Sequence, residues 1–239
     1  MNGILVRLTV RALLLQRRSL ALAALAAAPL LMSFVFAVGA RAGANHRLFY
    51  STLVQQLFLP IVAALVALVV GVSALGDERE DGTVLYLVAT PVPRLVLVGS
   101  AIAAAWITAM VLLVPSLLLS AVLALGHRLT AGDLLWPLLG TALACLAYCS
   151  ASAWLSLRVR RPVVIGVLYI LLWEGSIATF AASASKLSIA AYGRALVAQA
   201  LPQANPPVAG PVASFIVLSV VVAGACWLGA RLLSRVELP

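Results

Sequence analysis

Six apolar stretches, each long enough to cross a bilayer, fill most of this 239-residue chain. A helix needs about 20 predominantly apolar residues to cross a hydrocarbon core of about 30 Å. The stretches that meet this criterion are 19–40, 52–75, 95–125, 134–157, 162–182 and 208–230. Hydrophobic residues make up 64% of the chain and charged residues 10%, a balance that excludes a water-soluble domain. We therefore predict an all-α membrane protein, one domain over 1–239 with six transmembrane helices.

The basic residues predict the orientation. Lys and Arg gather in cytoplasmic loops, and an even number of spans puts both termini on one side. Cytoplasmic termini place eleven basic residues inside: Arg7, Arg11, Arg17, Arg18, Arg79, Arg94, Arg158, Arg160, Arg161, Arg231 and Arg235. The five that remain outside are Arg41, Arg47, Arg128, Lys186 and Arg194. Membrane topology thus accounts for the net charge of +9, and we predict no nucleic-acid partner.

Residues 2–18 precede the first span with the pattern of an amphipathic helix. Its basic side chains Arg7, Arg11 and Arg18 lie largely opposite its apolar ones, which predicts a helix in the inner membrane interface. The alternative is a signal peptide, because small residues at 37–40 resemble a cleavage site. The apolar stretch is longer than the usual signal core of about 7 to 15 residues, which favours an uncleaved span.

A short charged segment between the second and third spans holds four of the seven acids. It reads Asp77, Glu78, Arg79, Glu80, Asp81, Gly82 and Thr83, followed by an apolar run and by Thr90-Pro91-Val92-Pro93-Arg94. The pattern predicts a short helix at the cytoplasmic membrane surface, with the acids in its first turn. Such acids suit a basic or mixed-charge cleft on a soluble partner, and the alternative is a solvated loop. A calcium loop is excluded because Arg79 and Val88 occupy ligand positions.

At these residues the chain resembles the permease subunits of ABC-2 type transporters. In that family a Glu-Arg-x-x-Gly-Thr segment that runs on to Thr-Pro-x-x-Arg forms the coupling helix, which docks on a nucleotide-binding ATPase subunit. The resemblance extends to the N-terminal helix, the six-span layout and Leu171-Leu172-Trp173-Glu174-Gly175, with Leu187-Ser188-Ile189, Tyr192 and Arg194 after it. It implies docking through residues 77–83 and Arg94, re-entrant helices over 176–201, and a second permease copy or homologue.

Motifs for catalysis and metal binding are absent from the sequence. It contains no phosphate loop, no Gly-x-Ser-x-Gly elbow and no His-Glu-x-x-His pair. We therefore expect a non-catalytic subunit that binds no cofactor itself, with ATP and Mg on the partner subunit. Cys145 and Cys149 share a helical face without further ligands, so we predict small-residue packing and no metal site.

Glu174 is the ionisable residue expected deepest in the membrane. It lies about 12 residues past the cytoplasmic edge of its span, hence about 18 Å deep at about 1.5 Å per residue. Intramembrane carboxylates are costly and usually face a bundle interior or water. We therefore select Trp173, Glu174, Tyr192 and Arg194 as intramembrane or pathway residues. The alternative for Glu174 is a structural ion pair with Arg194 or Arg41.

These observations predict a permease subunit of an ATP-driven exporter for an apolar or amphipathic substrate. The alternatives are a membrane scaffold or assembly factor and, ranked last, an ion-coupled secondary carrier, for which no internal repeat is found. Fifteen of the 16 basic residues are arginines, which is typical of GC-rich bacterial genomes and indicates a bacterial cytoplasmic membrane.

Overall fold

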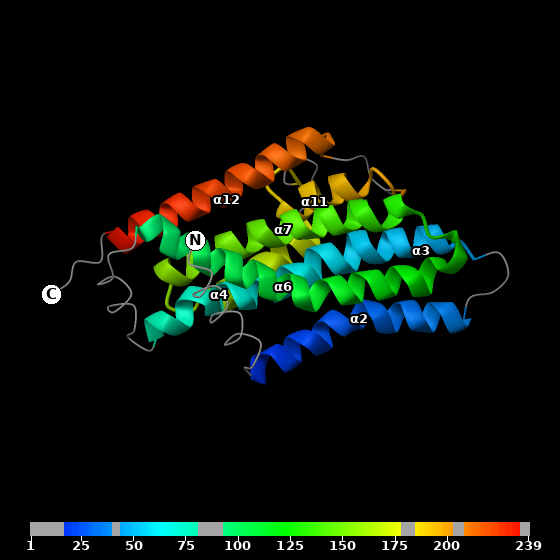
Figure 1. Cartoon of the computed structure of the whole chain (residues 1–239), viewed down its shortest axis with the longest axis horizontal. Coiled ribbons are helices and arrows are strands. Elements are labelled where there is room, and N and C mark those ends of the chain that lie inside the picture. Colours follow the sequence, from blue (N-terminus) through cyan, green and yellow to red (C-terminus); the bar gives the residue numbers. More distant parts are fainter. Residues whose placement is uncertain (1–16, 40–43, 81–92, 178–184, 203–207, 235–239) are drawn as a thin grey trace.

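The computed structural model describes residues 17–39, 44–80, 93–177, 185–202 and 208–234. Every regular element within these ranges is a helix, and the long helices run roughly side by side (Figure 1). The long elements are α2 (Arg17–Gly39), α4 (Ala64–Glu80), α6 (Arg94–Leu125), α7 (Ala131–Arg158) and α12 (Pro211–Ser234). Figure 1 shows α2 at one edge of the bundle and α12 at the opposite edge, so these two leave the most apolar surface uncovered.

The shorter elements extend or connect the long ones. They are α3 (His46–Thr52), the π-helix η1 (Leu53–Ala63), the 3-10 turn η2 (Gly126–Arg128), α8 (Pro162–Leu168), the π-helix η3 (Tyr169–Ile177) and α11 (Ile189–Val197). α3, η1 and α4 follow one another without a break, so that they form one long helix. The Asn45 side chain accepts a hydrogen bond from the Leu48 amide and so caps this helix at His46, six residues before the predicted start of the second span.

Within the described residues, five helices are long and apolar enough to cross a bilayer, which confirms a multi-pass membrane protein. They are Leu20–Gly39, His46–Gly76, Arg94–Arg128, Ala131–Arg158 and Pro211–Leu232, close to five of the six predicted spans. The predicted span over 162–182 appears as the shorter apolar helix Pro162–Glu174, and 178–184 lie outside the described residues. The six-span count therefore stays a prediction.

Small residues let α7 pack closely on η1 and α4. A Cβ atom on Gly71 would lie only 2.1 Å from Ser152 Oγ and 2.9 Å from the carbonyl oxygen of Cys149. The Cys145 thiol lies 3.8 Å from the carbonyl oxygen of Ala63, and the Cys149 thiol contacts α4 in the same way. The predicted role of both cysteines in small-residue packing is confirmed.

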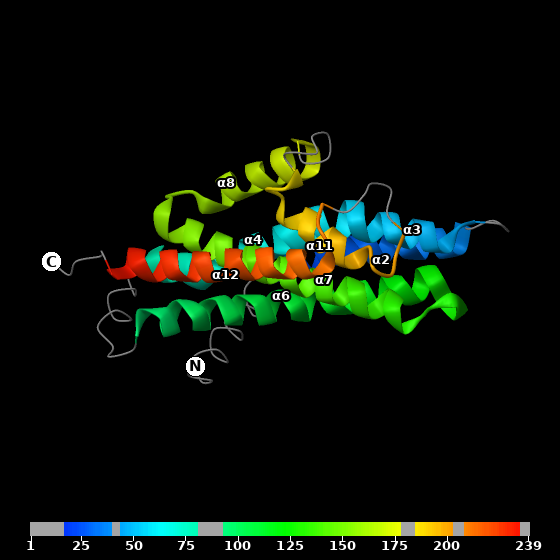
Figure 2. The same cartoon turned by 90° about the horizontal axis from the view of Figure 1, so that it is seen from above.

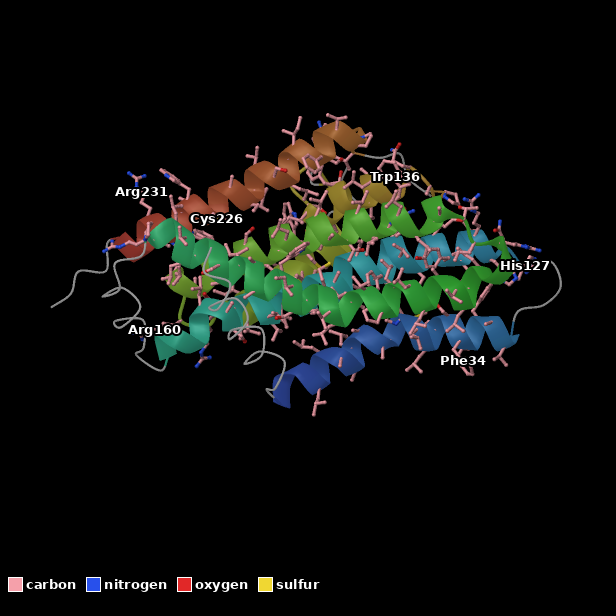
Figure 3. The ribbon with its side chains drawn as sticks, viewed as in Figure 1. Phe34, His127, Trp136, Arg160, Cys226 and Arg231 are labelled. Carbon is pink, nitrogen blue, oxygen red and sulfur yellow. The ribbon has the colours of Figure 1, made fainter. Side chains whose placement is uncertain are left out.

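The basic side chains are divided between the two ends of the bundle. Figure 3 shows Arg160 and Arg231 at one end and His127 at the other. The end with the two arginines is also where α4 and α7 finish and α6 begins (Figure 1). The arginine-rich end is the one that the charge rule assigns to the cytoplasm.

The acidic segment lies partly outside the described residues. Asp77, Glu78, Arg79 and Glu80 form the last turn of α4, whereas Asp81, Gly82 and Thr83 are not described. The prediction that the acids open a new helix is wrong for the first four residues, because the apolar helix simply continues through them. Arg94 starts α6 after Pro93, whose fixed backbone angle suits a helix start.

Candidate functional site

The site lies where a short helix, α11, meets the end of η3 on one side of the bundle. Figure 2 shows α8 entering from the end at which α7 finishes, with η3 ending part of the way along the bundle. α11 packs against the other half of α7. Contacts near the middle of α11 and just after its carboxyl end fix the direction of α11 and its position along α7.

Two glycines bring α11 and α7 together. A Cβ atom on Gly140 would lie 2.8 Å from the carbonyl oxygen of Gly193, and one on Gly193 would lie 3.2 Å from the Cβ of Ala144. One end of α11 continues to Ala200, which shares the Arg47 guanidinium with Asp133 in the first turn of α7. α11 is therefore antiparallel to α7, and its amino terminus lies near Ala144, the midpoint of α7.

The Glu174 carboxylate caps the amino terminus of α11. The side chain is fully buried, and Oε1 accepts hydrogen bonds from the amides of Ile189 at 2.9 Å and Ala190 at 3.5 Å. Oε2 accepts one from the Ser188 hydroxyl, and the Tyr169 hydroxyl lies 3.4 Å from Oε1. The first amides of a helix have no partner within it, and its dipole favours negative charge there. Glu174, which belongs to η3, thus accepts hydrogen bonds from the free amides of α11 and places its negative charge at the positive end of the α11 dipole.

Arg194 lies close to Glu174 without forming an ion pair. Their charges interact, but among the described residues no carboxylate oxygen lies within 4.0 Å of the Arg194 guanidinium. Arg194 is only 8% exposed. Glu174 therefore has a structural partner, as the alternative from the sequence expected, but this partner is the amino terminus of α11 and not the Arg194 side chain. Arg41, the other candidate partner, lies outside the described residues.

Trp173 and Tyr192 take separate positions. The Tyr192 hydroxyl donates to the carbonyl oxygen of Lys186 at 2.9 Å in an exposed contact. The buried indole nitrogen of Trp173 has no hydrogen-bond partner among the described residues. Tyr148 of α7 lies near Glu174, and its hydroxyl interacts electrostatically with both Glu174 and Arg194. Sequence reasoning missed Tyr148 because a tyrosine in an apolar span resembles ordinary core.

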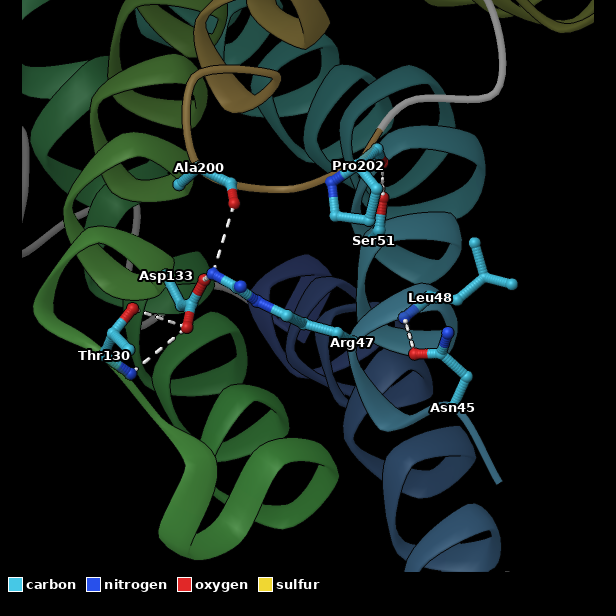
Figure 4. A network of polar contacts seen from close by, with 8 residues as sticks. All are labelled: Asn45, Arg47, Leu48, Ser51, Thr130, Asp133, Ala200 and Pro202. Carbon is cyan, nitrogen blue, oxygen red and sulfur yellow. Dashed lines mark hydrogen bonds and ion pairs between the residues drawn. The ribbon is translucent and has the colours of Figure 1, made fainter. Parts of the chain in front are cut away.

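A second polar network holds the other end of α11 (Figure 4). Arg47 Nη2 lies 2.7 Å from Asp133 Oδ1, and it also donates to the carbonyl oxygen of Ala200 at 3.4 Å. Asp133 is fully buried, and its other oxygen accepts from the hydroxyl and the amide of Thr130. The Thr-x-x-Asp spacing of a capping box is the sequence signal that indicates this site.

The same network extends to α3 and η1. The Ser51 hydroxyl donates to the carbonyl oxygen of Pro202, and Gln55 Nε2 donates to the same oxygen at 3.2 Å and to Ser51 Oγ at 3.0 Å. Ser51 and Gln55 are both buried. We refer to Arg47, Ser51, Gln55 and Asp133 together as the outer clamp. α11 is thus held at both ends, by Glu174 of η3 and by the outer clamp.

The residues predicted to dock the ATPase subunit and to form the interfacial helix lie partly outside the described residues. The predicted docking residues Asp77 to Glu80 continue the backbone of α4, and Asp81 to Thr83 lie outside the described residues. Arg94 is half-buried at the start of α6. Arg7 and Arg11 of the interfacial helix lie outside the described residues, and Arg18 lies in the first turn of α2. Docking and interfacial binding therefore stay predictions.

Comparison with known families decides the class of protein. The family model of the ABC-2 family transporter proteins matches residues 15–188, well over half of the chain. The chain belongs to the ABC-2 transporter family. The resemblance seen in the sequence is thereby confirmed. A search among curated proteins finds no match.

Membership of the ABC-2 family assigns the chain to membrane transport. The matched range includes the acidic turn of α4 and Glu174, and it ends at Ser188, which caps α11. A permease of this family associates with an ATP-binding subunit. α11, with Arg194, and α12 lie beyond the matched range.

Proposed function

We propose that this chain is the permease subunit of an ATP-driven exporter that moves an apolar or amphipathic substrate. A separate nucleotide-binding subunit binds ATP and Mg and docks on residues 77–83 and Arg94, and a second copy or homologue of the permease completes the transporter. The observation that carries the proposal is the family match over residues 15–188. The proposed location is a bacterial cytoplasmic membrane, with both termini and the arginine-rich end of the bundle in the cytoplasm.

The chain offers a path from the proposed docking surface to α11. The acidic turn of α4 ends the helix that begins at His46, and the outer clamp side chains Ser51 and Gln55 lie near the other end of that helix. A push on the docking surface would therefore move the outer clamp, because a continuous packed helix transmits displacement along its axis. The outer clamp holds the end of α11, and Glu174 holds its start.

The interior of the bundle suits an apolar or amphipathic substrate. Most buried side chains of α4, α6 and α7 are Ala, Val and Leu, and the buried charges of the described residues are Asp133, Glu174 and Arg194. A large hydrophilic cargo would need many more polar partners along its path. The buried charged side chains lie on α11 or at its two ends, whereas the other buried polar side chains, mostly Ser and Thr, are spread over the bundle.

Purification of the chain from its own membrane tests the proposal. We expect a phosphate-loop ATPase to co-purify in a fixed ratio, and the reconstituted complex to hydrolyse ATP faster when an amphipathic substrate is present. The matched control is the same complex with the phosphate-loop lysine of the ATPase subunit replaced by Ala, which should assemble without hydrolysing ATP. A chain that purifies without any ATPase would support the scaffold alternative.

A further inference from the structure

The long helix formed by α3, η1 and α4 changes its hydrogen-bond pattern part of the way along. α3 and α4 are α-helical, whereas the eleven residues of η1 between them, Leu53–Ala63, form a π-helix. The pattern is irregular at both junctions. The Leu53 amide donates to two carbonyl oxygens at once, and the Ala64 amide donates to Ile61, only three residues earlier. π-helices mostly occupy a single turn and are frequent at functional sites, so a longer one needs a physical cause.

Pro60 favours the π geometry of η1. In an α-helix the proline ring clashes with the carbonyl group of the residue four positions earlier, which here is Gln56. The wider turn of a π-helix, in which hydrogen bonds span five residues, moves that carbonyl group away from the ring. A proline alone is not sufficient, because Pro29, Pro115 and Pro137 lie inside the α-helices α2, α6 and α7. η1 therefore needs a further contribution, which its contacts provide.

Contacts to α11 and α7 fix how η1 is turned about its axis. Near its start, Gln55 Nε2 donates to the carbonyl oxygen of Pro202 at 3.2 Å. In its middle, a Cβ atom on Gly193 of α11 would lie 3.3 Å from Leu59 Cδ2. At its end, the carbonyl oxygen of Ala63 lies 3.8 Å from a thiol of α7. The number of residues per turn decides whether all three contacts can form together, so they fit the π-helix and would not all fit an α-helix.

Conversion of η1 to an α-helix would turn α3 relative to α4. An α-helix has fewer residues per turn and a greater rise per residue, so the eleven residues would wind further and extend further along the axis. α4 is held by the close contact of Gly71 with α7, so the change would appear at the α3 end. There Ser51 and Gln55 both donate to the Pro202 carbonyl oxygen, and Figure 4 shows Ser51 beside Pro202. A turned α3 could not keep both donors on that oxygen.

We propose that η1 is a conformational switch, which is a π-helix at rest and converts to an α-helix when the partner subunit binds ATP, and that this conversion releases α11 from the outer clamp. The inference rests on the proposed transport function, since it names the movement that links the docking surface to the outer end of the bundle. The backbone favours the α-helix, whereas Pro60 and the contacts with α7 and α11 favour the π-helix. A displacement of α4 along its axis changes the length that η1 must cover and so shifts this balance.

Thiol bridging within η1 tests the proposal in the purified permease–ATPase complex. Gln56, Leu57 and Ile61 are at least partly exposed, so cysteines can be placed there in a cysteine-free background. Side chains five residues apart lie near one another in a π-helix but on different faces of an α-helix, whereas side chains four residues apart are close in both. Dibromobimane becomes fluorescent once it joins two thiols, so the rate of bridging reports the type of helix.

We expect dibromobimane to bridge Gln56→Cys with Ile61→Cys in the resting complex, and this bridging to be lost once the complex is trapped with ATP and vanadate. Leu57→Cys with Ile61→Cys is the matched control, because it should be bridged in both states. Leu118→Cys with Leu123→Cys, which are five residues apart in the α-helix α6, should be bridged in neither.

Two substitutions test what holds the π geometry. Pro60→Ala removes the ring that favours it, and Gln55→Leu removes the donor that connects η1 with Pro202. Each should lower the rate of bridging between positions 56 and 61 in the resting complex. Pro115→Ala is the matched control, because Pro115 lies inside α6 and should leave that rate unchanged. If Pro60→Ala fails to fold, Gln55→Leu and the comparison of the two states still decide.

Two results would overturn the proposal. One is equal bridging between positions 56 and 61 in the resting and trapped complexes, which would mean that η1 keeps one conformation. The other is an unchanged rate in both Pro60→Ala and Gln55→Leu, which would mean that neither residue sets the geometry of η1. Bridging at rest needs no ATP, so a failure to recover an ATPase would overturn the proposed function and leave this measurement intact. Equal bridging in a complex whose ATP hydrolysis still responds to substrate would overturn the switch alone.

Discussion

The amide nitrogen of Ile189 lies 2.9 Å from Oε1 of Glu174, so a carboxylate of η3 holds the first turn of α11. The turn after α11 is held by the outer clamp, where Gln55 and Ser51 donate to Pro202. α11 therefore connects the helix that begins at His46 with the segment that follows α7. Neither connection is an ordinary loop contact, because each uses buried polar side chains.

Replacing Glu174 should destabilise the complex through the loss of this cap. Glu174→Gln keeps one acceptor oxygen but loses the charge, so we expect a loss of about 1 to 3 kcal/mol in the free energy of unfolding. The measurement is thermal unfolding of the detergent-solubilised complex, with Tyr192→Phe as the control for an exposed hydrogen bond. The exchange Glu174→Arg with Arg194→Glu should not restore stability, because the two residues form no ion pair. An unchanged Tm in Glu174→Gln would contradict the capping role.

The outer clamp should show coupling between Arg47 and Asp133. Arg47 is about half exposed, so the pair itself is worth about 1 kcal/mol or less, whereas Asp133 is buried and also caps α7. We expect Asp133→Asn to cost more stability than Arg47→Gln. A double-mutant cycle on the Tm values measures the coupling, and additive effects would show that the 2.7 Å contact contributes nothing.

Close packing of α4 on α7 should make Gly71→Ala destabilising. The added methyl group would clash with Ser152 Oγ and the Cys149 carbonyl, and overpacking typically costs about 1 to 3 kcal/mol. The matched control is Gly224→Ala in α12, where nothing lies within 4 Å and helix propensity favours Ala. Ser152→Ala should restore part of the stability of Gly71→Ala. Equal stability of the two single variants would refute the close contact.

Cysteine labelling in intact cells tests the orientation. In a cysteine-free background, a cysteine at Thr130 should react with an impermeant maleimide, whereas one at Gly82 should react only after the membrane is opened. Thr130 is exposed and closely follows η2, whose His127 lies at the end of the bundle opposite Arg160 and Arg231 (Figure 3). Ser51 would be a poor reporter, because it is buried in the outer clamp. Labelling of Gly82→Cys in sealed cells would reverse the proposed topology.

Charge reversal tests the docking surface. Glu78→Lys with Glu80→Lys should reduce recovery of the ATPase subunit, because like charges facing each other at an interface can cost several kcal/mol. The matched control is Arg128→Glu at the other end of the bundle, which should leave recovery unchanged. If the double reversal keeps both the ATPase subunit and its substrate-stimulated hydrolysis, the acids belong to a solvated loop.

The sequence predicted the long helices better than the site. Length and apolar content were enough to locate five spans, because a bilayer imposes both on any crossing helix. The start of the second span was missed, because His46 and Arg47 look like loop residues until the Asn45 cap and the Arg47–Asp133 contact are seen. Asp133 could have been found from its capping-box spacing.

The partners of Glu174 could not be read from the sequence. A buried carboxylate invites a search for a positive side chain, and Arg194 was the obvious choice. The partner is instead the backbone of Ile189 and Ala190, and a main-chain amide leaves no mark in a sequence. Tyr148 was equally hidden, since only the antiparallel packing of α11 on α7 brings its hydroxyl near Glu174.

The meeting of η3 and α11 has a consequence for how the chain enters the membrane during synthesis. The nine residues of α11 are too few to be inserted as a span by their own hydrophobicity. α11 needs the surfaces that α7 and η1 provide, so it should reach its place only once the earlier helices have assembled. A chain in which a bulky residue replaces Gly140 should therefore insert its first three spans normally. The segment that contains α11 should then stay accessible to quality-control proteases.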